Sequence, residues 1–387
     1  MSGKATAALW LALVGPSLFI VQKYTGGAAA AAYALIAAVA VVVTPRIPVP
    51  ASRRARTSAA VVTLLLVVVA FAVIYPTANV QIPGLGSDDD DAHNAGVRAL
   101  LEGRYPYAER TYLGNVLHQL PGAFVLAAPF VIAGTSALQN LFWLPMFFLA
   151  VRKEAGDGAE LRLAWLVLAM SPTVLHQIVT GTGYVANTIY VTLGLWWLTR
   201  TAHTNLAAAA WGVAVASRAN FLLLLPLACG WLWRHRGQRA AVLATAIAGG
   251  TAAALILPFS LHDPAHFTPL EAADRLLRFD VVFPYAGEGV GALAVALAIL
   301  LSCLRMDRAG LFRNCALVQA LPVVAGVLLT GWGRAALAYA VYGTFAAWFV
   351  FIASADRFAD TGNSRGPNRD APRSASGPAV AVDPART

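Results

Sequence analysis

The stretch that decides the fold is residues 59–75, AAVVTLLLVVVAFAVIY, in which no side chain is charged. A helix rises about 1.5 Å per residue, so a run of this length nearly spans the roughly 30 Å hydrocarbon core of a bilayer. Hydrophobic residues occupy 58% of the 387 positions and charged residues 12%, about half the usual share in soluble proteins. The sequence therefore predicts an all-α, polytopic transmembrane helical bundle.

Similar apolar runs recur along nearly the whole chain and predict about 11–13 spans, in the plasma membrane. The candidate spans are 5–21, 28–43, 59–75, 121–133, 137–151, 161–178, 183–199, 207–233, 240–258, 287–304, 311–331 and 335–353. The first run has only Lys4 ahead of it and leads into a second apolar run. It is therefore expected to be a retained helix and not a cleaved signal peptide.

The basic residues orient these spans. The loop after the second span contains Arg46, Arg53, Arg54 and Arg56 and no acidic residue, which places it in the cytoplasm. The third span then delivers residues 76–120 to the outside, and the later basic loops leave residues 259–286 outside as well. Because Lys and Arg lie in short clusters between apolar runs, the net charge of +9 does not indicate nucleic-acid binding.

Two segments leave the topology open. Segment 121–133 is short for a crossing, and segment 207–233 is too long for one untilted span. Strict alternation places the loop 152–162 outside, whereas a re-entrant 121–133 and a split near Asn220 place it inside. We favour the second arrangement, in which residues 171–187 face outside. From Ser354 the composition becomes rich in Ser, Pro, Gly, Asp and Arg, so the transmembrane domain is expected over 1–353 and a disordered cytoplasmic tail over 354–387.

The first external loop contains the clearest candidate chemistry. Four consecutive acids, Asp88 to Asp91, lie just beyond the outer end of the third span and precede an amphipathic helix. Its polar side holds Asp91, Asn94, Arg98 and Glu102. Its apolar side holds Val97, Leu100 and Leu101. We expect this helix to lie on the membrane surface, apolar side down, and to end at Gly103. An acidic run alone is more often only a solvated helix start.

The spacing of residues in this loop adds a second indication. The order Asp89, Gly96, Leu100 and Leu101, Gly103, Tyr107 resembles the first external loop of the GT-C glycosyltransferases, especially the actinobacterial polyprenyl-phosphate-mannose-dependent mannosyltransferases. This chain has His93 where that family usually has Tyr. Residues 111–130 are similar to the same superfamily's re-entry into the membrane. The resemblance implies a GT-C fold with external juxtamembrane helices, and Asp89 as the catalytic base.

The resemblance further implies transfer of a sugar, mannose-like or another hexose or pentose, from a polyprenyl-phosphate donor to an extracytoplasmic glycolipid or glycan acceptor. The chemistry of the residues agrees. An attacking hydroxyl must lose a proton, for which a positioned carboxylate is a competent base. If the phosphate leaves from the opposite face, the configuration inverts. Asp89, with Asp90 and Asp91 as its helpers, is the candidate catalytic group.

The anionic leaving group is best held by guanidinium groups, whose planar fork matches phosphate oxygens. The candidate substrate-binding residues outside the spans are His93, Arg98, Glu102, Arg104, Tyr107, His118, Arg275 and Arg278, with Arg334 at an outer span end. Any single one of these arginines could equally be an interfacial anchor. Arg218 differs, because it lies within an apolar segment where charge is costly. It is expected either to contact substrate or to pair with an internal acid.

Metal and disulfide patterns are weak. Cys229, Cys303 and Cys315 lie in or beside apolar runs without C-x-x-C spacing, and the histidines lack the spacing of a zinc triad. Carboxylates are the ligands that Mg²⁺ or Mn²⁺ would take, which makes Asp89 and Asp91 the candidate metal ligands, although the sequence does not decide whether a metal is used.

Other functions stay open on the sequence alone. A transporter or flippase of lipid-linked sugars would share the hydropathy but would normally place ionisable groups within the spans. The chain shows no internal repeat of the kind on which many transporters are built. Acyl or phospho transfer could use an Asp or His base as well. In the second external loop, Thr268, Pro269 and Glu271 have the spacing of a helix-capping box, and that helix is expected to lie at the interface as a headgroup contact or as a wall of the site.

Overall fold

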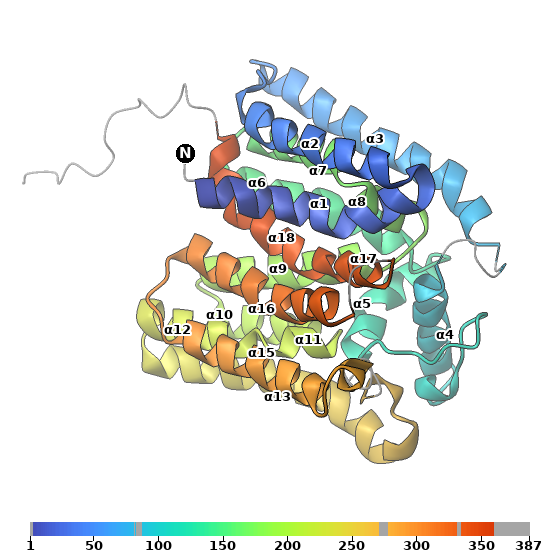
Figure 1. Cartoon of the computed structure of the whole chain (residues 1–387). Coiled ribbons are helices and arrows are strands. Elements are labelled where there is room, and N and C mark those ends of the chain that lie inside the picture. Colours follow the sequence, from blue (N-terminus) through green and yellow to red (C-terminus); the bar gives the residue numbers. More distant parts are fainter. Residues whose placement is uncertain (1–2, 81, 83–86, 271–277, 331–333, 360–387) are drawn as a thin grey trace, which may run out of the picture.

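The structure, a computed structural model, describes residues 3–80, 82, 87–270, 278–330 and 334–359. These residues form helices joined by short turns, with an isolated β-bridge between Arg110 and Val116 (Figure 1). The α-helices are α1 (Gly3–Thr25), α2 (Gly27–Val43), α3 (Arg53–Ala78), α4 (Asp89–Leu101), α5 (Pro121–Ile132), α6 (Leu138–Ala155), α7 (Ala159–Met170), α8 (Pro172–Val179), α9 (Tyr184–Arg200), α10 (Thr204–Val215), α11 (Ala219–Leu222), α12 (Leu225–Arg236), α13 (Gln238–His262), α15 (Ala286–Ser302), α16 (Arg308–Leu329), α17 (Arg334–Ala340) and α18 (Thr344–Ala353). The 3₁₀ helices are η1 (Thr44–Arg46), η2 (Pro106–Ala108), η3 (Pro264–His266), η4 (Thr268–Leu270), η5 (Arg278–Val281), η6 (Val341–Gly343) and η7 (Ala355–Phe358).

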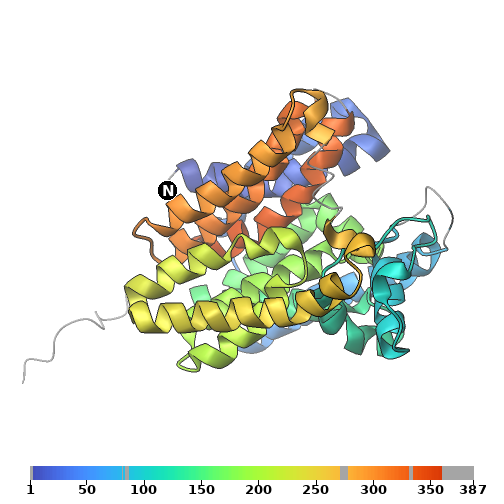
Figure 2. The same ribbon diagram turned by 90° about the horizontal axis from the view of Figure 1, so that it is seen from below.

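The long helices lie side by side with their axes roughly aligned, and α4 packs at one end of them (Figures 1 and 2). Among the described residues, six helices are long and apolar enough to cross a membrane, or seven if the bent pair α7–α8 counts as one span. The other expected spans fall on shorter helices, such as α9, α10, α12 and α15, or on α6, whose last turns carry Arg152, Lys153 and Glu154. The expectation of an all-α polytopic bundle is confirmed.

The surface of α3 explains why this bundle needs a membrane. Val61, Val62, Leu65, Leu66 and Val69 are all exposed on that helix. An apolar face of this kind would be unfavourable in water, and a bilayer covers it. The interior, in contrast, is packed with aromatic side chains, such as Phe147 against Trp348 at 4.8 Å between ring centroids.

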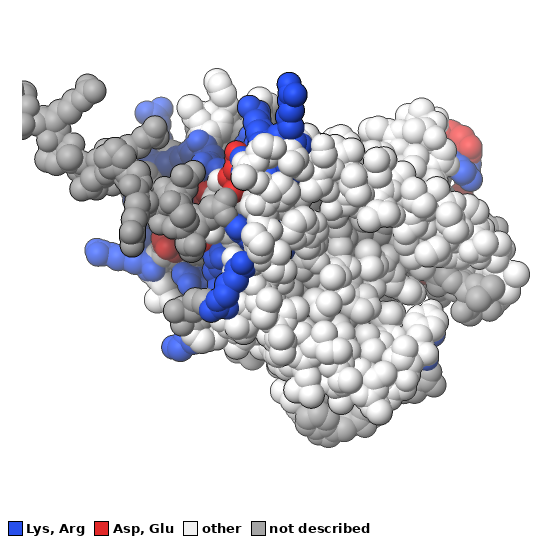
Figure 3. All heavy atoms as spheres, turned by 90° about the horizontal axis from the view of Figure 1, so that it is seen from above, with Lys and Arg blue, Asp and Glu red and all other residues white. Residues whose placement is uncertain are grey.

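The charged side chains gather mainly at one end of the bundle, with a smaller group at the other (Figure 3). At the main charged end Arg56 pairs with Asp157 at 3.3 Å, and Glu154 accepts from Arg200 at 2.5 Å and from Arg308 at 3.0 Å. These contacts place the loop 152–162 at the same end as the arginines in the first turn of α3. The second of the two topologies is therefore the one that the described residues adopt.

Helix α5 does not cross the bundle. The residue before its cap, Gln119, donates to Asp89 at the start of α4, and Ser136, beyond its other end, donates through its backbone N–H to Asn94 of the same helix. Both ends of α5 therefore lie beside α4, as expected for the re-entrant arrangement. The short length of the apolar run reflects this geometry.

The segment 207–233 is interrupted where the sequence suggested a split. Helix α10 ends at Val215, the four-residue α11 begins at Ala219, and α12 begins at Leu225. Arg218 lies in the break with an extended backbone, φ −150° and ψ 144°. Helices α7 and α8 are bent relative to each other by 83° at Ser171, which precedes Pro172. A proline cannot donate the hydrogen bond that would continue the preceding helix.

The ordered chain extends past the expected start of the tail. Phe358 in η7 is fully buried, and its carbonyl accepts a hydrogen bond from Arg162 at 2.7 Å. The tail expected from Ser354 therefore begins too early, because an aromatic anchor follows that position. Residues 360–387, which make up the rest of the expected tail, lie outside the described residues.

Candidate functional site

Helix α4 begins and ends as its residues dictate. Asp89, Asp90 and Asp91 occupy its first turn, where negative charge interacts favourably with the helix dipole. Gly103 takes a positive φ of 70° just beyond the end, and the N–H of Arg104 reaches back to the carbonyl of Ala99 at 2.7 Å. Such a glycine termination is common because glycine adopts this backbone conformation without strain. The expected end of the helix at Gly103 is confirmed.

The orientation expected for α4 is wrong in part. Asn94, assigned to the solvent side, is buried, whereas the 62% exposure of Leu101 is compatible with the membrane-facing side to which it was assigned. The helix packs instead through Val97 and Gly96. A Cβ atom at Gly96 would lie 2.4 Å from Phe124 of α5, so only glycine fits this contact. The buried face therefore includes Val97 of the apolar side, and the close approach of α5 at Gly96 extends it beyond that side.

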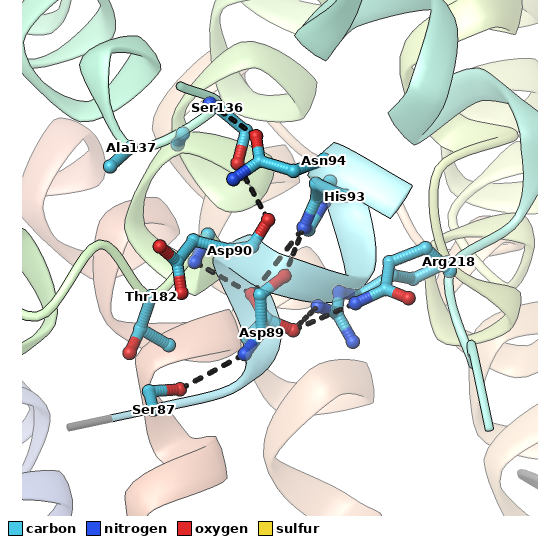
Figure 4. A network of polar contacts seen from close by, with 12 residues as sticks. Ser87, Asp89, Asp90, His93, Asn94, Ser136, Ala137, Thr182 and Arg218 are labelled. Carbon is cyan, nitrogen blue, oxygen red and sulfur yellow. Dashed lines mark hydrogen bonds and ion pairs between the residues drawn. The ribbon is translucent and has the colours of Figure 1, made fainter. Parts of the chain in front are cut away.

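The carboxylate of Asp89 is held from several sides (Figure 4). One oxygen, Oδ1, accepts from Nη2 of Arg218 at 2.8 Å and from Nε2 of Gln119 at 2.9 Å. The other, Oδ2, accepts from the backbone N–H of Gly183 at 2.7 Å. Asp89 is only 8% exposed. Asp89 is therefore one half of a buried ion pair and not an exposed loop carboxylate.

Arg218 is fixed by the break in which it lies. Its guanidinium carbon lies 4.6 Å from the ring centroid of Tyr184 and 5.6 Å from that of Phe345, both within cation–π range. With the Asn187 amide oriented so that both of its groups are satisfied, its oxygen accepts from Nε of Arg218 at 2.7 Å. Of the two roles expected for Arg218, the structure therefore gives it the internal acid, Asp89, as partner.

The charge of Asp89 follows from this environment. Burial by itself would raise the pKa of Asp89, but the charge of Arg218, together with His93 and the Gly183 hydrogen bond, lowers it below its ordinary value. Burial lowers the pKa of His93. Its Nδ1 lies 2.6 Å from the carbonyl oxygen of Asp89, which can only accept, so this nitrogen carries the proton. The site therefore places a carboxylate that favours ionisation beside an imidazole whose protonated form is disfavoured by burial.

Asp90 has the opposite character. Its side chain is fully buried, and Oδ2 accepts from the hydroxyl of Tyr75 at 2.6 Å. Burial, with the nearby charge of Asp89 as a further contribution, raises the pKa of Asp90 to about 6. The two adjacent carboxyl groups thus have pKa values pushed apart by their surroundings, a property often found at functional sites.

The outer two acids of the run organise the loop that follows. Oδ2 of Asp88 accepts from Thr111 and from Asn115, each at 2.8 Å, and Oδ2 of Asp91 accepts from the backbone N–H of Tyr112 at 2.8 Å. Both acids therefore tie the segment 111–115 to the start of α4. The run is more than a solvated helix start, because each of its four carboxylates has a partner.

The structure does not bring every candidate residue to Asp89. Arg104 pairs with Glu102 at 2.6 Å and also with Glu109, all on the surface at the other end of α4. A helix of 13 residues separates its ends by about 18 Å, so Glu102 and Arg104 lie away from Asp89. Arg98 is exposed on a different face of α4 from His93. These three residues are not part of the Asp89 cluster.

Tyr107 has a positioning role. It is buried, and its hydroxyl donates to the carbonyl of Gln119 at 3.0 Å, which fixes the residue whose side chain binds Asp89. His118, beside Gln119, is partly buried. Arg275 lies outside the described residues, as do the side chains of Arg278 and Arg334. Thr268 and Pro269 of the expected capping box begin the 3₁₀ helix η4, and the Thr268 hydroxyl donates to the carbonyl of Leu117 at 2.5 Å, while Glu271 lies outside the described residues.

Three partners in this site carry no signal in the sequence pattern. Gln119 and Tyr75 lie beside or within apolar runs, and Gly183 acts through its backbone N–H. A Cβ atom at Gly183 would lie 2.9 Å from the His93 ring and 3.0 Å from Asp89, so the approach needs glycine. The position of Gly183 between α8 and α9 is the one feature of the sequence that points to a close approach at this place.

The expected Mg²⁺ or Mn²⁺ site gains no geometric support. Within the described residues, no group of three or more His, Cys, Asp or Glu side chains is arranged to hold a metal ion. Asp89 binds a guanidinium group, and Asp91 binds a backbone N–H. A cation at Asp89 would have to compete with Arg218 for the same oxygen.

Comparisons with known proteins leave the identity open. No family model matches the sequence, and no curated protein and no solved structure is significantly similar to it. The assignment of a function therefore depends on the site itself.

Proposed function

We propose that the chain is an integral membrane glycosyltransferase that moves a sugar from a polyprenyl-phosphate donor to an extracytoplasmic glycolipid or glycan acceptor, with inversion. The observation that carries the proposal is the buried Asp89–Arg218 pair at the end of the bundle away from the main basic cluster, with 2.8 Å between Oδ1 and Nη2. A base for the acceptor and a cation for the leaving phosphate lie side by side there.

In the proposed reaction, an acceptor hydroxyl attacks the anomeric carbon of the donor. The hydroxyl proton passes to the carboxylate of Asp89 as the new carbon–oxygen bond forms. The bond between the anomeric carbon and the phosphate oxygen breaks, and its electron pair leaves with the lipid phosphate. The attack and departure on opposite faces invert the configuration, and no protein nucleophile is required.

Arg218 links the two halves of this reaction. In the resting site its guanidinium binds Asp89 and so holds the carboxylate in its weakly basic, ionised form. A donor phosphate offers Arg218 a competing anion with matching bidentate geometry. When the donor is bound, the guanidinium of Arg218 would bind the phosphate in place of the Asp89 carboxylate. The basicity of Asp89 would then rise only in the presence of the donor.

The experiment that tests this proposal compares donor classes. The purified full chain is incubated with radiolabelled polyprenyl-phosphate sugars and membrane acceptors, and in parallel with nucleotide sugars. We expect transfer from the lipid-linked donor alone, since no glycine-rich loop for cradling a nucleotide phosphate is apparent in the sequence. Turnover of a nucleotide sugar without any lipid-linked donor would overturn the proposal.

A flippase or transporter of lipid-linked sugars is the second candidate. The observation that favours it is the burial of Asp90, whose pKa near 6 would allow proton uptake in the physiological range. The two candidates differ in product. A transporter moves the labelled lipid-linked sugar across a vesicle membrane unchanged, whereas a glycosyltransferase attaches the label to the acceptor.

A further inference from the structure

The polar face of α4 that does not meet Arg218 borders a pocket of about 350 Å³. Asp91, Asn94 and Arg98 line it from α4 at spacings of three and four residues, which places them on one side of a helix. The end of α3 and the turn after α5 supply the other walls, through Tyr75, Asn79 and Thr135. The sequence pattern would assign this face to bulk solvent, but neighbouring segments form walls beside it.

The walls of the pocket are held by hydrogen bonds. The hydroxyl of Tyr75, which donates to Asp90, accepts from the amide of Asn79 at 3.0 Å and lies 2.8 Å from the hydroxyl of Thr135. Asn94 reaches the same hydroxyl of Thr135 at 3.4 Å. The Tyr75 ring also stacks on Phe71, with 4.7 Å between centroids. The polar groups are therefore preorganised, which lowers the entropic cost of binding a ligand.

The chemistry of these groups selects the kind of ligand. Asp91 and Arg98 have opposite charges, so the lining has no net charge to attract an anion or a cation. The remaining groups are hydroxyls and amides, which both donate and accept hydrogen bonds. A sugar hydroxyl also does both. The volume lies near the lower limit of small-molecule sites, about 300–1,000 Å³, and so suits one monosaccharide unit.

We propose that this pocket binds a neutral, hydroxyl-rich small ligand, a single sugar unit, at a site separate from the Asp89–Arg218 pair. Arg98 and Asn79 donate to its hydroxyl oxygens, and Asp91 accepts from its hydroxyl hydrogens. This binding does not depend on the reaction proposed at Asp89, although the pocket would suit part of a glycan acceptor.

Saturation-transfer NMR on the full chain in detergent micelles tests the proposal. The probes are the methyl glycosides of mannose, glucose and arabinose, and inorganic phosphate is the competitor. We expect at least one glycoside to bind saturably at millimolar concentration and phosphate not to displace it. Arg98→Ala and Asn79→Ala should each weaken the affinity about tenfold or more, since each removes a hydrogen-bond donor.

The controls separate this site from other effects. Arg110→Ala removes an exposed arginine outside the pocket and should leave the affinity unchanged. Arg98 is exposed, so its removal is expected to leave folding intact even if Asn79→Ala, at the end of α3, does not. Asp89→Asn should retain glycoside binding, so a failure of the proposed transfer reaction would not be mistaken for a failure here. Absence of saturable binding by all three glycosides, unchanged affinity in Arg98→Ala, or displacement by phosphate would each overturn the proposal.

Discussion

At Asp89, burial and charge act in opposite directions. Burial disfavours the ionised carboxylate, whereas Arg218 favours it, and the net result is a pKa below the ordinary value. A buried pair of this kind stabilises a fold little relative to apolar residues, but removal of one member leaves an uncompensated charge. The pair is therefore better explained by function than by stability.

Substitution of Arg218 separates the need for a charge from the need for a planar fork. Arg218→Lys keeps the charge but loses the shape that contacts Asp89, Asn187 and the Tyr184 ring. We expect transfer by Arg218→Lys to fall about tenfold or more, and Arg218→Ala to lose stability as well. Radiolabel transfer and thermal melting in detergent measure the two effects. Normal turnover in Arg218→Lys would reduce Arg218 to an electrostatic anchor.

The raised pKa of Asp90 predicts a specific dependence of the stability of the fold on pH. Its pKa is raised from 3.8 to about 6, so between these values the folded state retains a proton that the unfolded state has lost. The contribution of Asp90 to stability is therefore greatest below about pH 4 and is lost as the pH rises through about 6, by about 3 kcal/mol at most. Asp90→Asn should lack this slope in melting experiments from pH 4 to 7. The same slope in both proteins would show that Asp90 is not the titrating group.

The residues of this site could be predicted from sequence only in part. The acidic run identified Asp89, and the position of Arg218 in an apolar segment identified its buried partner. The donors Gln119 and Gly183 could not be found, because an amide and a backbone N–H have no pattern until the fold brings them to the carboxylate. Tyr107 was found by its spacing, but its contact with the Gln119 carbonyl depends on the path of the chain between them.

At the scale of the elements, α5 positions both sides of the site. Its first residues bind the end of α10, where Gly122 donates to the carbonyl of Ala216 at 2.9 Å and Leu120 to that of Ser217 at 3.0 Å. These bonds satisfy carbonyl groups at the helix end that precedes Arg218. The short length of the apolar run 121–133 suggested that α5 does not cross the membrane. Only the structure shows which helix ends α5 joins.

Substitution of Gly122 tests this role of α5. A Cβ atom there would lie 2.3 Å from the carbonyl oxygen of Val213, a backbone atom that cannot move aside as a side chain could. Gly122→Ala should therefore destabilise the protein by about 1–3 kcal/mol and reduce transfer by displacing Arg218. Gly250→Ala in α13, where a Cβ atom meets open space, is the matched control and should melt at or slightly above the wild-type temperature. Equal melting temperatures for the two variants would contradict this packing.

At the scale of the whole molecule, the charged side chains are divided between the two ends of the bundle, which favours one orientation in the membrane. The arginines at the start of α3, the loop 152–162 and the end of α12 gather at one end, and α4 lies at the other. The apolar runs and the positive-inside rule were enough to predict this arrangement, because both follow from the energetics of the bilayer. The break at Arg218 was predicted near Asn220, whereas the bend at Ser171 was missed because the sequence predicts one apolar span over 161–178.

Reporter fusions test the orientation. A reporter active only in the cytoplasm should be active when fused after Arg56, after Asp157 or after Arg365, and silent after Glu102. The Asp157 fusion distinguishes the observed topology from strict alternation, because Asp157 pairs with Arg56. Activity after Glu102 would place α4 in the cytoplasm and remove the basis for a lipid-linked donor supplied from outside.

The most direct test of the central claim is the transfer rate of Asp89→Asn with a polyprenyl-phosphate sugar. Asparagine keeps the shape but cannot act as the base, so turnover should fall by about 10²- to 10⁴-fold. Asp88→Asn, which keeps an acceptor for Thr111 and Asn115, is the matched control and should be much milder. Because Asp89→Asn leaves Arg218 unpaired, the double variant Asp89→Asn with Arg218→Gln should recover stability but not turnover. Near-normal transfer by Asp89→Asn would contradict the account.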